Sequence, residues 1–464
     1  MNEPGTKNYF FYIFFTLLLA VCIFFGLKNI LPERLFPENQ TQSPNIVIDS
    51  LALNAMNESE KQDSINLIGK KGNIVPDSLE ELASTKNMEG HINIIDFYEK
   101  LYQLENSDTK KEKVRIAYFG DSMTDGDLIV QDIRRMFQQK YGGEGVGFVG
   151  ITSLSATSRY SVGHKFSSGW KTYSFLRNIN SKVMFGIDGQ VSFAKRQNDC
   201  TLEYKANDLK NCQQLNIPTL FYGKSNNEVA CIEITINKDS TKKINLNAEQ
   251  LLNTVTLATN GISNIKLRFI NSDSIPFYGI NFDNKKGIHI DNFSMRGNSG
   301  LPLSLLNTQL MQSFDKALHY DLIILQYGAN VLGYGTTDYG WYEKKMTAVV
   351  EHLHSCFPNA DILIVSVADK ASKQDMEMKT DKAVIPLINA QRKYAQNTNS
   401  AFINLFNLMG GEDSMVKWVE DAPSLANKDY THFNAAGAKK IASLIYDEID
   451  RGYAKYKKLK DLGK

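Results

Sequence analysis

Val114-Arg-Ile-Ala-Tyr-Phe119, followed at once by Gly120-Asp121-Ser122, is the stretch of sequence that decides the fold. Its β-branched and aromatic side chains predict a buried strand, which Gly120 ends. Apolar residues then recur at helical spacing, which predicts a helix after the strand; they are Ile129, Ile133, Met136 and Phe137. A strand that turns into a helix is the unit of α/β proteins, whose ligands bind beyond the carboxyl ends of the strands.

More strand-like runs follow along the chain, and helical stretches separate them. The runs are Leu322–Leu325, Ile362–Val367 and Phe402–Leu405. A last helix is expected from the spacing of Ile441, Leu444, Ile445 and Ile449. Strands that alternate with helices predict a three-layer α/β fold, in which helices cover both faces of a parallel sheet.

The stretch 161–290 has a different pattern. Ile265-Lys-Leu-Arg-Phe269 alternates strictly between apolar and charged residues, and Val229–Ile236 is rich in β-branched residues without a helical period. We therefore expect an antiparallel β module at this place. It would be inserted between a first part of the α/β domain, at 91–160, and a second part, at 291–464.

The composition is that of an ordinary globular protein. The 464 residues include 52 Lys and Arg against 51 Asp and Glu, so the net charge of +1 gives no electrostatic reason to expect nucleic acid as a partner. Hydrophobic residues make up 42% and charged residues 22%, which argues against wholesale disorder. Five cysteines are too few for a disulfide scaffold, although a single Cys200–Cys212 bridge stays open outside the cytosol.

The N-terminus carries an apolar segment. Asn8 to Leu27 are 20 residues without a charge, enough for a helix to cross a hydrocarbon core of about 30 Å. A cleaved signal peptide is the alternative, but no cut site with small residues follows. Leu19-Ala-Val-Cys22 resembles the box before a lipidated cysteine, yet the apolar run continues beyond it. We expect a transmembrane anchor at 1–27 and a flexible tether at 28–90.

Ser122 is the first candidate for chemistry. It lies where the strand 114–119 is expected to turn into a helix. Its hydroxyl would then be exposed at a helix N-terminus, where backbone N–H groups can stabilise an oxyanion. A serine in this position can equally be a simple helix cap.

Two later motifs supply the groups that a serine nucleophile needs. Asp429 and His432 are three residues apart, which puts both side chains on one face of a helical turn. The carboxylate can then fix the imidazole tautomer that accepts a proton from Ser122. Asn330 follows the strand 322–325 and can aim its side-chain N–H at an oxyanion. Taken singly, these residues could also be a surface histidine and a turn asparagine.

In this order, the motifs resemble the GDSL/SGNH hydrolase family. The resemblance implies that Ser122 is the nucleophile, that His432 is the base and that Asp429 orients it. It implies an SGNH-like three-layer fold and requires no metal and no cofactor.

The resemblance also implies an oxyanion hole. The family's second block corresponds to Gly297-Asn-Ser-Gly300, in which Gly300 is the expected donor and Gly297 the alternative. Ser122 and Asn330 would supply the other two donors. Val331 stands where the family has an Asp after the Asn.

A finer resemblance covers about residues 114–455. Gly120-Asp-Ser-Met-Thr-Asp-Gly-Asp127, Tyr141-Gly-Gly-Glu-Gly-Val-Gly-Phe148 and Phe277-Tyr-Gly-Ile280 look like the peptidoglycan O-acetylesterase branch. That branch has a carbohydrate-binding-like β module between the first and second blocks, the position of 161–290 here. Met123 stands where the branch often has His.

The function expected is that of a membrane-anchored serine esterase that removes O-acetyl groups from a cell-envelope glycan. The chain would be a single-pass protein of the inner membrane, with its catalytic domain facing the periplasm or the exterior. Two alternatives stay open. One is an O-acetyltransferase that works on a glycan with a membrane acyl-carrying partner, and the other is a noncatalytic glycan-binding protein.

Four other patterns have weaker functional interpretations. Gly145–Gly150 matches a dinucleotide fingerprint but follows a helix rather than a strand. His352-Leu-His354-Ser-Cys356 has metal-type ligands whose spacing does not share a helix face. Asp127 can orient the Ser122 loop, although a role in the first helical turn is favoured. Four aromatic residues after Asn330 could stack on sugars, although packing is favoured; they are Tyr334, Tyr339, Trp341 and Tyr342.

Overall fold

The computed structural model describes residues 14–16, 18–19, 49–59, 85–106, 113–195, 200–237 and 239–463. The chain divides into two units, Met1–Ile46 and Val47–Lys464. Of the first unit, 14–16 and 18–19 are described and are helical. Within these ranges, no helix is long and apolar enough to cross a membrane. The rest of the predicted anchor at 1–27 lies outside the described residues.

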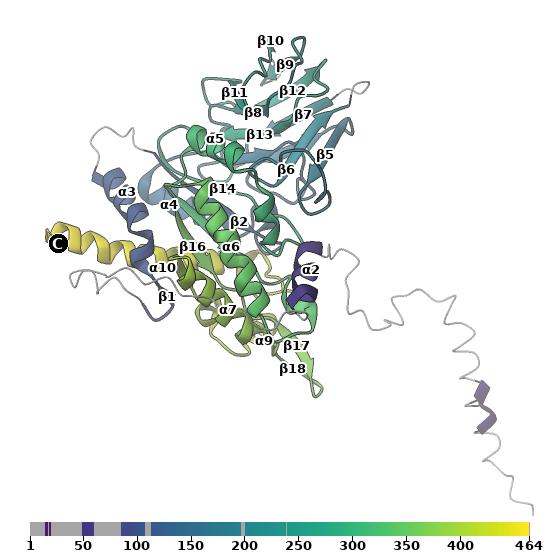
Figure 1. Cartoon of the computed structure of the whole chain (residues 1–464), viewed down its shortest axis with the longest axis vertical. Coiled ribbons are helices and arrows are strands. Elements are labelled where there is room, and N and C mark those ends of the chain that lie inside the picture. Colours follow the sequence, from purple (N-terminus) through teal and green to yellow (C-terminus); the bar gives the residue numbers. More distant parts are fainter. Residues whose placement is uncertain are drawn as a thin grey trace, which may run out of the picture. The chain divides into compact units, whose positions relative to one another are not determined.

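The second unit is built around a six-stranded sheet (Figure 1). Its neighbouring strands are, in order, β1 (Met88–Glu89), β19 (Ala401–Ile403), β16 (Asp361–Val365), β15 (Leu322–Gln326), β2 (Lys113–Gly120) and β14 (Gly287–Asn292). All pairs are parallel except that of β1 with β19. The carboxyl ends of β2, β14 and β15 therefore meet at one edge of the sheet.

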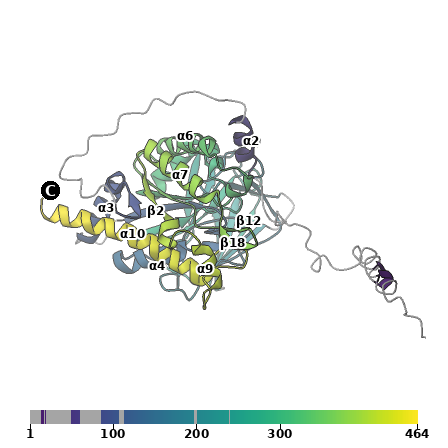
Figure 2. The ribbon, with the colours of Figure 1, turned by 90° about the horizontal axis from the view of Figure 1, so that it is seen from below.

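Helices cover both faces of this sheet (Figure 2). One face packs against α5 (Thr308–Leu318), α6 (Gly340–Cys356) and α7 (Val384–Asn397), and the other against α3 (Ile95–Asn106), α4 (Val130–Tyr141) and α10 (Ala435–Asp461). Along β2, Ala117 and Phe119 join the first core, whereas Ile116 and Tyr118 join the second. The strand is buried on both sides, which confirms the α/β prediction and explains why its sequence is apolar throughout.

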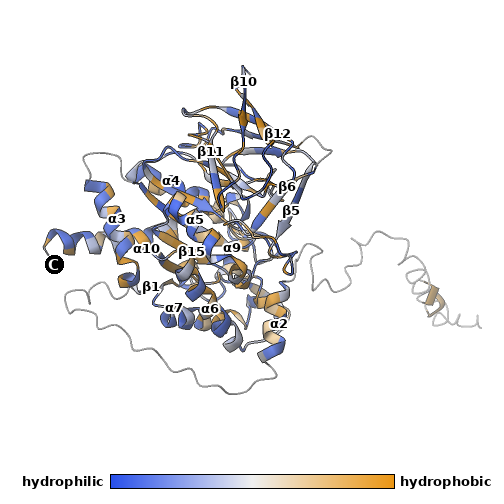
Figure 3. Cartoon of the chain, turned by 45° about the horizontal axis from the view of Figure 1, so that its top comes forward, coloured by the Kyte–Doolittle hydropathy of each residue, from blue (hydrophilic) through white to orange (hydrophobic). Residues whose placement is uncertain are grey.

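Short elements connect these layers. They are η3 (His91–Ile94), η4 (Asp125–Asp127), η5 (Leu301–Leu305), η6 (Leu332–Tyr334), β17 (Ala371–Gln374), β18 (Glu377–Thr380), α8 (Leu405–Met409) and α9 (Ser414–Glu420). Figure 3 shows the C-terminal end of α10 as mainly hydrophilic, in agreement with Lys458 and Lys460 in its last turn.

The inserted module is a sandwich of two antiparallel sheets with its own core. One sheet is β10 (Ser240–Asn245), β9 (Cys231–Ile236), β12 (Asn264–Ile270), β7 (Cys200–Lys205) and β4 (Gly163–Phe166). The other is β11 (Leu252–Thr256), β8 (Thr219–Gly223), β13 (Phe277–Phe282), β6 (Gln190–Ala194) and β5 (Trp170–Ser174), and β3 (Gly147–Gly150) pairs with β13. Because Cys212 is a free thiol, the Cys200–Cys212 bridge is not formed.

The predicted limits of the module, 161–290, are wrong at both ends. β3 lies before residue 161 and pairs with the module strand β13, whereas β14 ends near residue 290 and pairs in parallel with β2 of the main sheet. The Gly145–Gly150 pattern therefore lies largely in a strand of the module. Alternating and β-branched residues indicated the module, but they could not show which sheet each flanking strand joins.

Two contacts fix the module on the α/β domain. Phe314 of α5 stacks on Phe221 at 5.7 Å between ring centroids and contacts Phe148 and Tyr278 edge-on. At the other contact, the fully buried Arg115 of β2 donates hydrogen bonds to four oxygens of three side chains at 2.5–2.8 Å; they belong to Asn281, Asp283 and Asp291. The module is thus held through both an apolar and an ionic interface.

Two pieces of the predicted tether at 28–90 belong to the folded domain. The helix α2 (Ser50–Ser59) contacts α6 and η5 and buries Ala52 and Ala55 in the core. β1 forms the edge of the main sheet, where Met88 pairs with Ile403. The polar composition of 28–90 concealed both pieces, because each is short and contributes few side chains to the core.

Candidate active site

Ser122 lies two residues beyond the end of β2, in a turn at the carboxyl edge of the sheet. The turn is tight: a Cβ atom on Gly120 would come within 2.1 Å of the Thr124 hydroxyl. The prediction that Ser122 starts a helix is wrong, because α4 begins only at Val130, after η4 and after Ile129 with a φ of 63°. Oxyanion donors near Ser122 are therefore backbone N–H groups of a turn, not of a helix N-terminus.

Ser122, His432 and Asp429 form a continuous chain of hydrogen bonds. Ser122 Oγ lies 2.9 Å from His432 Nε2, and His432 Nδ1 lies 2.8 Å from Asp429 Oδ2. The carboxylate accepts the Nδ1 proton, so the neutral imidazole presents Nε2 as an acceptor to the Ser122 hydroxyl. This is the geometry in which a histidine can remove a proton from a serine.

Asp429 and His432 do not lie on a helical turn, as their spacing suggested. They lie in a turn before α10 that the Asp429 side chain itself closes, because its Oδ1 accepts the N–H groups of Thr431 and His432, both at 3.0 Å. Burial alone would raise the pKa of Asp429, but the hydrogen bond from the His432 side chain and these two N–H groups lower it to about 2. The carboxylate is therefore ionised at neutral pH.

Asn330 follows β15 and lies beside the turn that carries Ser122. Its Nδ2 donates to Asp121 Oδ2 at 3.2 Å and to the Asn298 carbonyl at 3.1 Å. Both of its N–H bonds are thus directed to protein oxygens, and donation to an oxyanion requires that one of them be shared. Asp121 is 1% exposed; burial raises its pKa to about 6, although the Met123 N–H and the charge of His432 oppose this shift.

The N–H of Gly300, the expected oxyanion donor, is engaged within its own loop. It donates to Asn298 Oδ1 at 2.9 Å, and a Cβ atom on Gly300 would meet Tyr327 and Met346, both buried in the core. Gly297 has a φ of 82° and directly precedes Asn298, whose carbonyl accepts the Asn330 amide. Gly297, the alternative glycine, is thus adjacent in the chain to the residue that binds Asn330.

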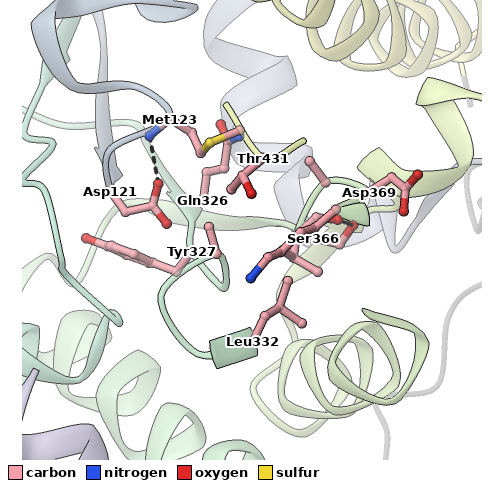
Figure 4. A pocket seen from close by; sticks show the side chains of 12 residues that line it. Asp121, Met123, Gln326, Tyr327, Leu332, Ser366, Asp369 and Thr431 are labelled. Carbon is pink, nitrogen blue, oxygen red and sulfur yellow. Dashed lines mark hydrogen bonds between the residues drawn. The ribbon is translucent and has the colours of Figure 1, made fainter. Parts of the chain in front are cut away.

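A small hollow opens beside the turn that follows β2 and carries Ser122, here called the nucleophile turn (Figure 4). Asp121 and Tyr327 line one side, and Ser366 and Asp369 line the other. Apolar side chains of Met123, Ala329 and Leu332 also reach it, whereas Ser122 and His432 are not among the residues that line it.

Asp127 holds the nucleophile turn through side-chain contacts. It lies before α4 and is buried, and both of its oxygens accept hydrogen bonds from Arg134, at 2.7 and 3.0 Å. Asn292 joins them and also donates to the Thr124 carbonyl at 2.8 Å. The preference for a helix-dipole role was therefore wrong, and loop orientation is the role that the contacts support.

The other residues that the sequence singled out take no part in the hydrogen-bond chain of Ser122, His432 and Asp429. Tyr339, Trp341 and Tyr342 are buried in the core of the α/β domain, and Tyr334 is half-buried beside Trp341. The His352–Cys356 pattern forms the C-terminal end of α6, of which Cys356 is the last residue. Within the described residues, no group of three or more His, Cys, Asp or Glu side chains could hold a metal ion.

Two contributors were missed from the sequence. Asp121 holds the Asn330 amide, and Ser299 fixes the loop between Gly297 and Gly300. Asp121 could have been recognised from the sequence because it directly precedes Ser122. Ser299 could not, because its role depends on a hydrogen bond with Asp49, which is distant in the chain.

The chain is similar to known proteins in part of its sequence and in its fold. A family model for the GDSL-like Lipase/Acylhydrolase family matches residues 276–440. A solved structure described as "Peptidoglycan O-acetylesterase in action, 5 min" is 20% identical, with a TM-score of 0.65 over 79% of this chain and 99% of that chain. A family two carbohydrate esterase from Cellvibrio japonicus is 10% identical, with a TM-score of 0.26 over 63% of this chain and 98% of its own. No curated protein matches the sequence.

The three-layer fold and the hydrogen-bonded Ser122, His432 and Asp429 side chains define a serine-hydrolase type of protein. Residues 276–440 match the GDSL-like Lipase/Acylhydrolase family, and the fold is shared with a solved peptidoglycan O-acetylesterase. The resemblance seen in the sequence is thereby confirmed at the level of the family.

Proposed function

We propose that this protein is a membrane-anchored serine esterase that removes O-acetyl groups from a cell-envelope glycan such as peptidoglycan. The observation that carries the proposal is the alignment of Ser122, His432 and Asp429 at 2.9 and 2.8 Å. The family match supports ester hydrolysis. The glycan is inferred from the motifs shared with the O-acetylesterase branch, from the β module in the same position and from the fold shared with a peptidoglycan O-acetylesterase.

In the reaction, Ser122 Oγ attacks the carbonyl carbon of the acetyl ester while its proton passes to His432 Nε2. Asp429 stabilises the imidazolium that forms. The C–O bond to the sugar then breaks, and His432 returns the proton to the sugar oxygen. Water repeats the sequence on the acetyl-enzyme: His432 takes a proton from the water, and acetate and the free Ser122 hydroxyl are released.

The negative charge on the carbonyl oxygen needs donors. We assign them to the backbone N–H groups of Ser122 and Gly297 and to the side chain of Asn330. Gly297 replaces Gly300 because the Gly300 N–H is bound to Asn298. Each such donor is worth about 10²–10³ in rate where it has been removed from other hydrolases.

The exposure of His432, the catalytic base, to solvent favours hydrolysis over acetyl transfer. The His432 side chain is 41% exposed and that of Asp429 is 50% exposed. Solvent therefore reaches the group that would activate the second nucleophile. A transferase that works with a membrane acyl-carrying partner would need to exclude this water from the acetyl-enzyme.

The location in the inner membrane, with the domain outside the cytoplasm, follows from the apolar segment Asn8–Leu27 and from the nature of the glycan. An O-acetylated glycan is then the partner of the active site.

The test measures acetate release by the full chain, kept in detergent, from O-acetylated peptidoglycan and O-acetylated polysaccharides. Ser122→Ala is expected to abolish release, whereas Ser355→Ala, on an exposed face of α6, is expected to leave it unchanged. No release from any glycan, together with a Ser122 that does not react with a serine-directed phosphonate, would refute the proposal. Labelling without release unless a sugar acceptor is added would identify a transferase.

A further inference from the structure

The carboxylate of Asp49 lies buried against the loop that carries Gly297. It is 3% exposed and about 250 residues away from that loop in the sequence. Asp49 Oδ2 accepts hydrogen bonds from both the backbone N–H of Ser299, at 3.1 Å, and the Ser299 hydroxyl. Its other oxygen accepts the Leu51 N–H at 3.0 Å, in the first turn of α2. One side chain thus joins the N-terminal segment to the loop.

Asp49 completes the set of bonds on Ser299. The Ser299 carbonyl accepts the Tyr342 hydroxyl at 2.6 Å, and its Oγ also accepts the Leu301 N–H at 3.2 Å. With the two bonds to Asp49, every polar atom of Ser299 has a partner. The residue cannot shift without breaking several of these bonds.

The fixed residue is adjacent to the proposed oxyanion site. Ser299 follows Asn298, whose carbonyl accepts the Asn330 amide at 3.1 Å, and Asn298 follows Gly297. A displacement of Ser299 would therefore move the peptide that lies between the two proposed donors. Donor positions matter because a misplacement of about 1 Å can cost about 10²-fold in rate.

We propose that Asp49 is a positioning residue that holds the Gly297–Asn298 peptide against Asn330 in the geometry needed to bind the oxyanion. The inference rests on the proposed function, because it concerns the same site. It means that the N-terminal segment before the α/β domain contributes to catalysis, in addition to any anchoring role.

The alternative is that Asp49 merely caps α2. Asp49→Ser separates the two roles, because serine is as good an N-cap as aspartate but is too short to cap Leu51 and accept from Ser299 together. Asp49→Asn keeps an acceptor oxygen and is the conservative variant. Glu58→Gln removes only the exposed ion pair of α2 with Lys345 and is the matched control.

The experiment measures kcat and KM for 4-nitrophenyl acetate with the full chain, and kcat is expressed per active site titrated with a phosphonate. Asp49→Ser is expected to lower kcat about 10-fold or more with KM changed less than twofold, since the loss concerns the transition state. Asp49→Asn should recover part of that loss, and Glu58→Gln should equal the wild type. Ser299→Ala combined with Asp49→Ser should lose less than the product of the single losses.

Equal kcat per titrated site in Asp49→Ser and the wild type would overturn the inference alone, since the wild type would still be active. A loss of titrated sites without a loss of kcat would do the same, because it would show a purely structural role. A wild type that neither turns over the ester nor reacts with the phosphonate would contradict the proposed function, and this inference with it.

Discussion

Replacement of Asp429 by asparagine tests whether the carboxylate selects the tautomer of His432. Asp429 Oδ1 accepts two backbone N–H groups at 3.0 Å, and Oδ2 accepts the His432 Nδ1 proton at 2.8 Å. In Asp429→Asn, the amide oxygen keeps the two backbone bonds, so the amide nitrogen faces His432. An amide nitrogen only donates, so the imidazole proton moves to Nε2, which faces Ser122 and then cannot accept its proton.

The size of the effect follows from these bonds. Recovery of the productive tautomer requires the amide to turn over and give up two backbone hydrogen bonds, each worth about 1 kcal/mol, which is about 2 kcal/mol in all. Loss of the charge beside the imidazolium adds about 1–2 kcal/mol, a low value because the Asp429 side chain is 50% exposed. The sum of about 3–4 kcal/mol corresponds to roughly 10²–10³ in kcat.

The assay compares Asp429→Asn with Asp429→Ala in the hydrolysis of 4-nitrophenyl acetate. Alanine removes the orienting group but does not force the wrong tautomer, so Asp429→Asn is expected to be at least as slow as Asp429→Ala. Thermal unfolding of both variants checks that the turn before α10 is intact. An Asp429→Asn enzyme with more than a tenth of the wild-type kcat would refute the tautomer argument.

Three further results are expected. Asn330→Ala should lower kcat about 10²–10³-fold with little change in KM, as measured on the same ester. Asp121 has a folded pKa of about 6, above its ordinary 3.8, so it contributes stability at low pH that is lost as pH rises from about 4 to 6. Asp121→Asn should therefore gain about 3 kcal/mol in unfolding free energy relative to the wild type between pH 4 and 7 in urea titrations, and a constant difference would contradict this. Arg115→Met should destabilise the protein by about 3–5 kcal/mol in the same titrations, because Asp283 and Asp291 would stay buried without their cation, and a loss below 1 kcal/mol would show that the network is dispensable.

Four of the six strands of the main sheet, β2, β15, β16 and β19, could be predicted from the sequence because each is a short apolar run between helical stretches. The runs at 114–119 and 322–325 became β2 and β15 with shifts of one residue at their ends. Such strands are buried on both faces, so their apolar character is continuous and easy to recognise. The edge strand β1 has only two residues and pairs far along the chain with β19, and no local pattern could show it.

The catalytic side chains were also accessible from the sequence, but the local conformations around them were not. Motif order pointed to Ser122, Asn330, Asp429 and His432, and the structure brings all four to one edge of the sheet. Helical spacing was assumed around Ser122 and around Asp429, and both segments are turns instead. In each turn a side chain binds nearby backbone: Asp121 accepts the Met123 N–H, and Asp429 accepts those of Thr431 and His432. Such bonds compete with helix formation, which the periodicity of apolar residues does not register.

The two halves of the site differ in how far apart their residues lie in the chain, and this difference has consequences for mutation. Asp429 and His432 are neighbours in one turn, so the base is oriented by local bonds that survive changes elsewhere. The oxyanion site depends on Asn330, on the Gly297–Asn298 peptide and, through Ser299, on Asp49, which lie on three separate segments. Its geometry is set by tertiary packing and is therefore sensitive to changes far from Ser122. Asp49→Ser should consequently lower turnover while leaving the shape of the pH–rate profile unchanged, whereas a variant of Asp429 in the turn before α10 should change both.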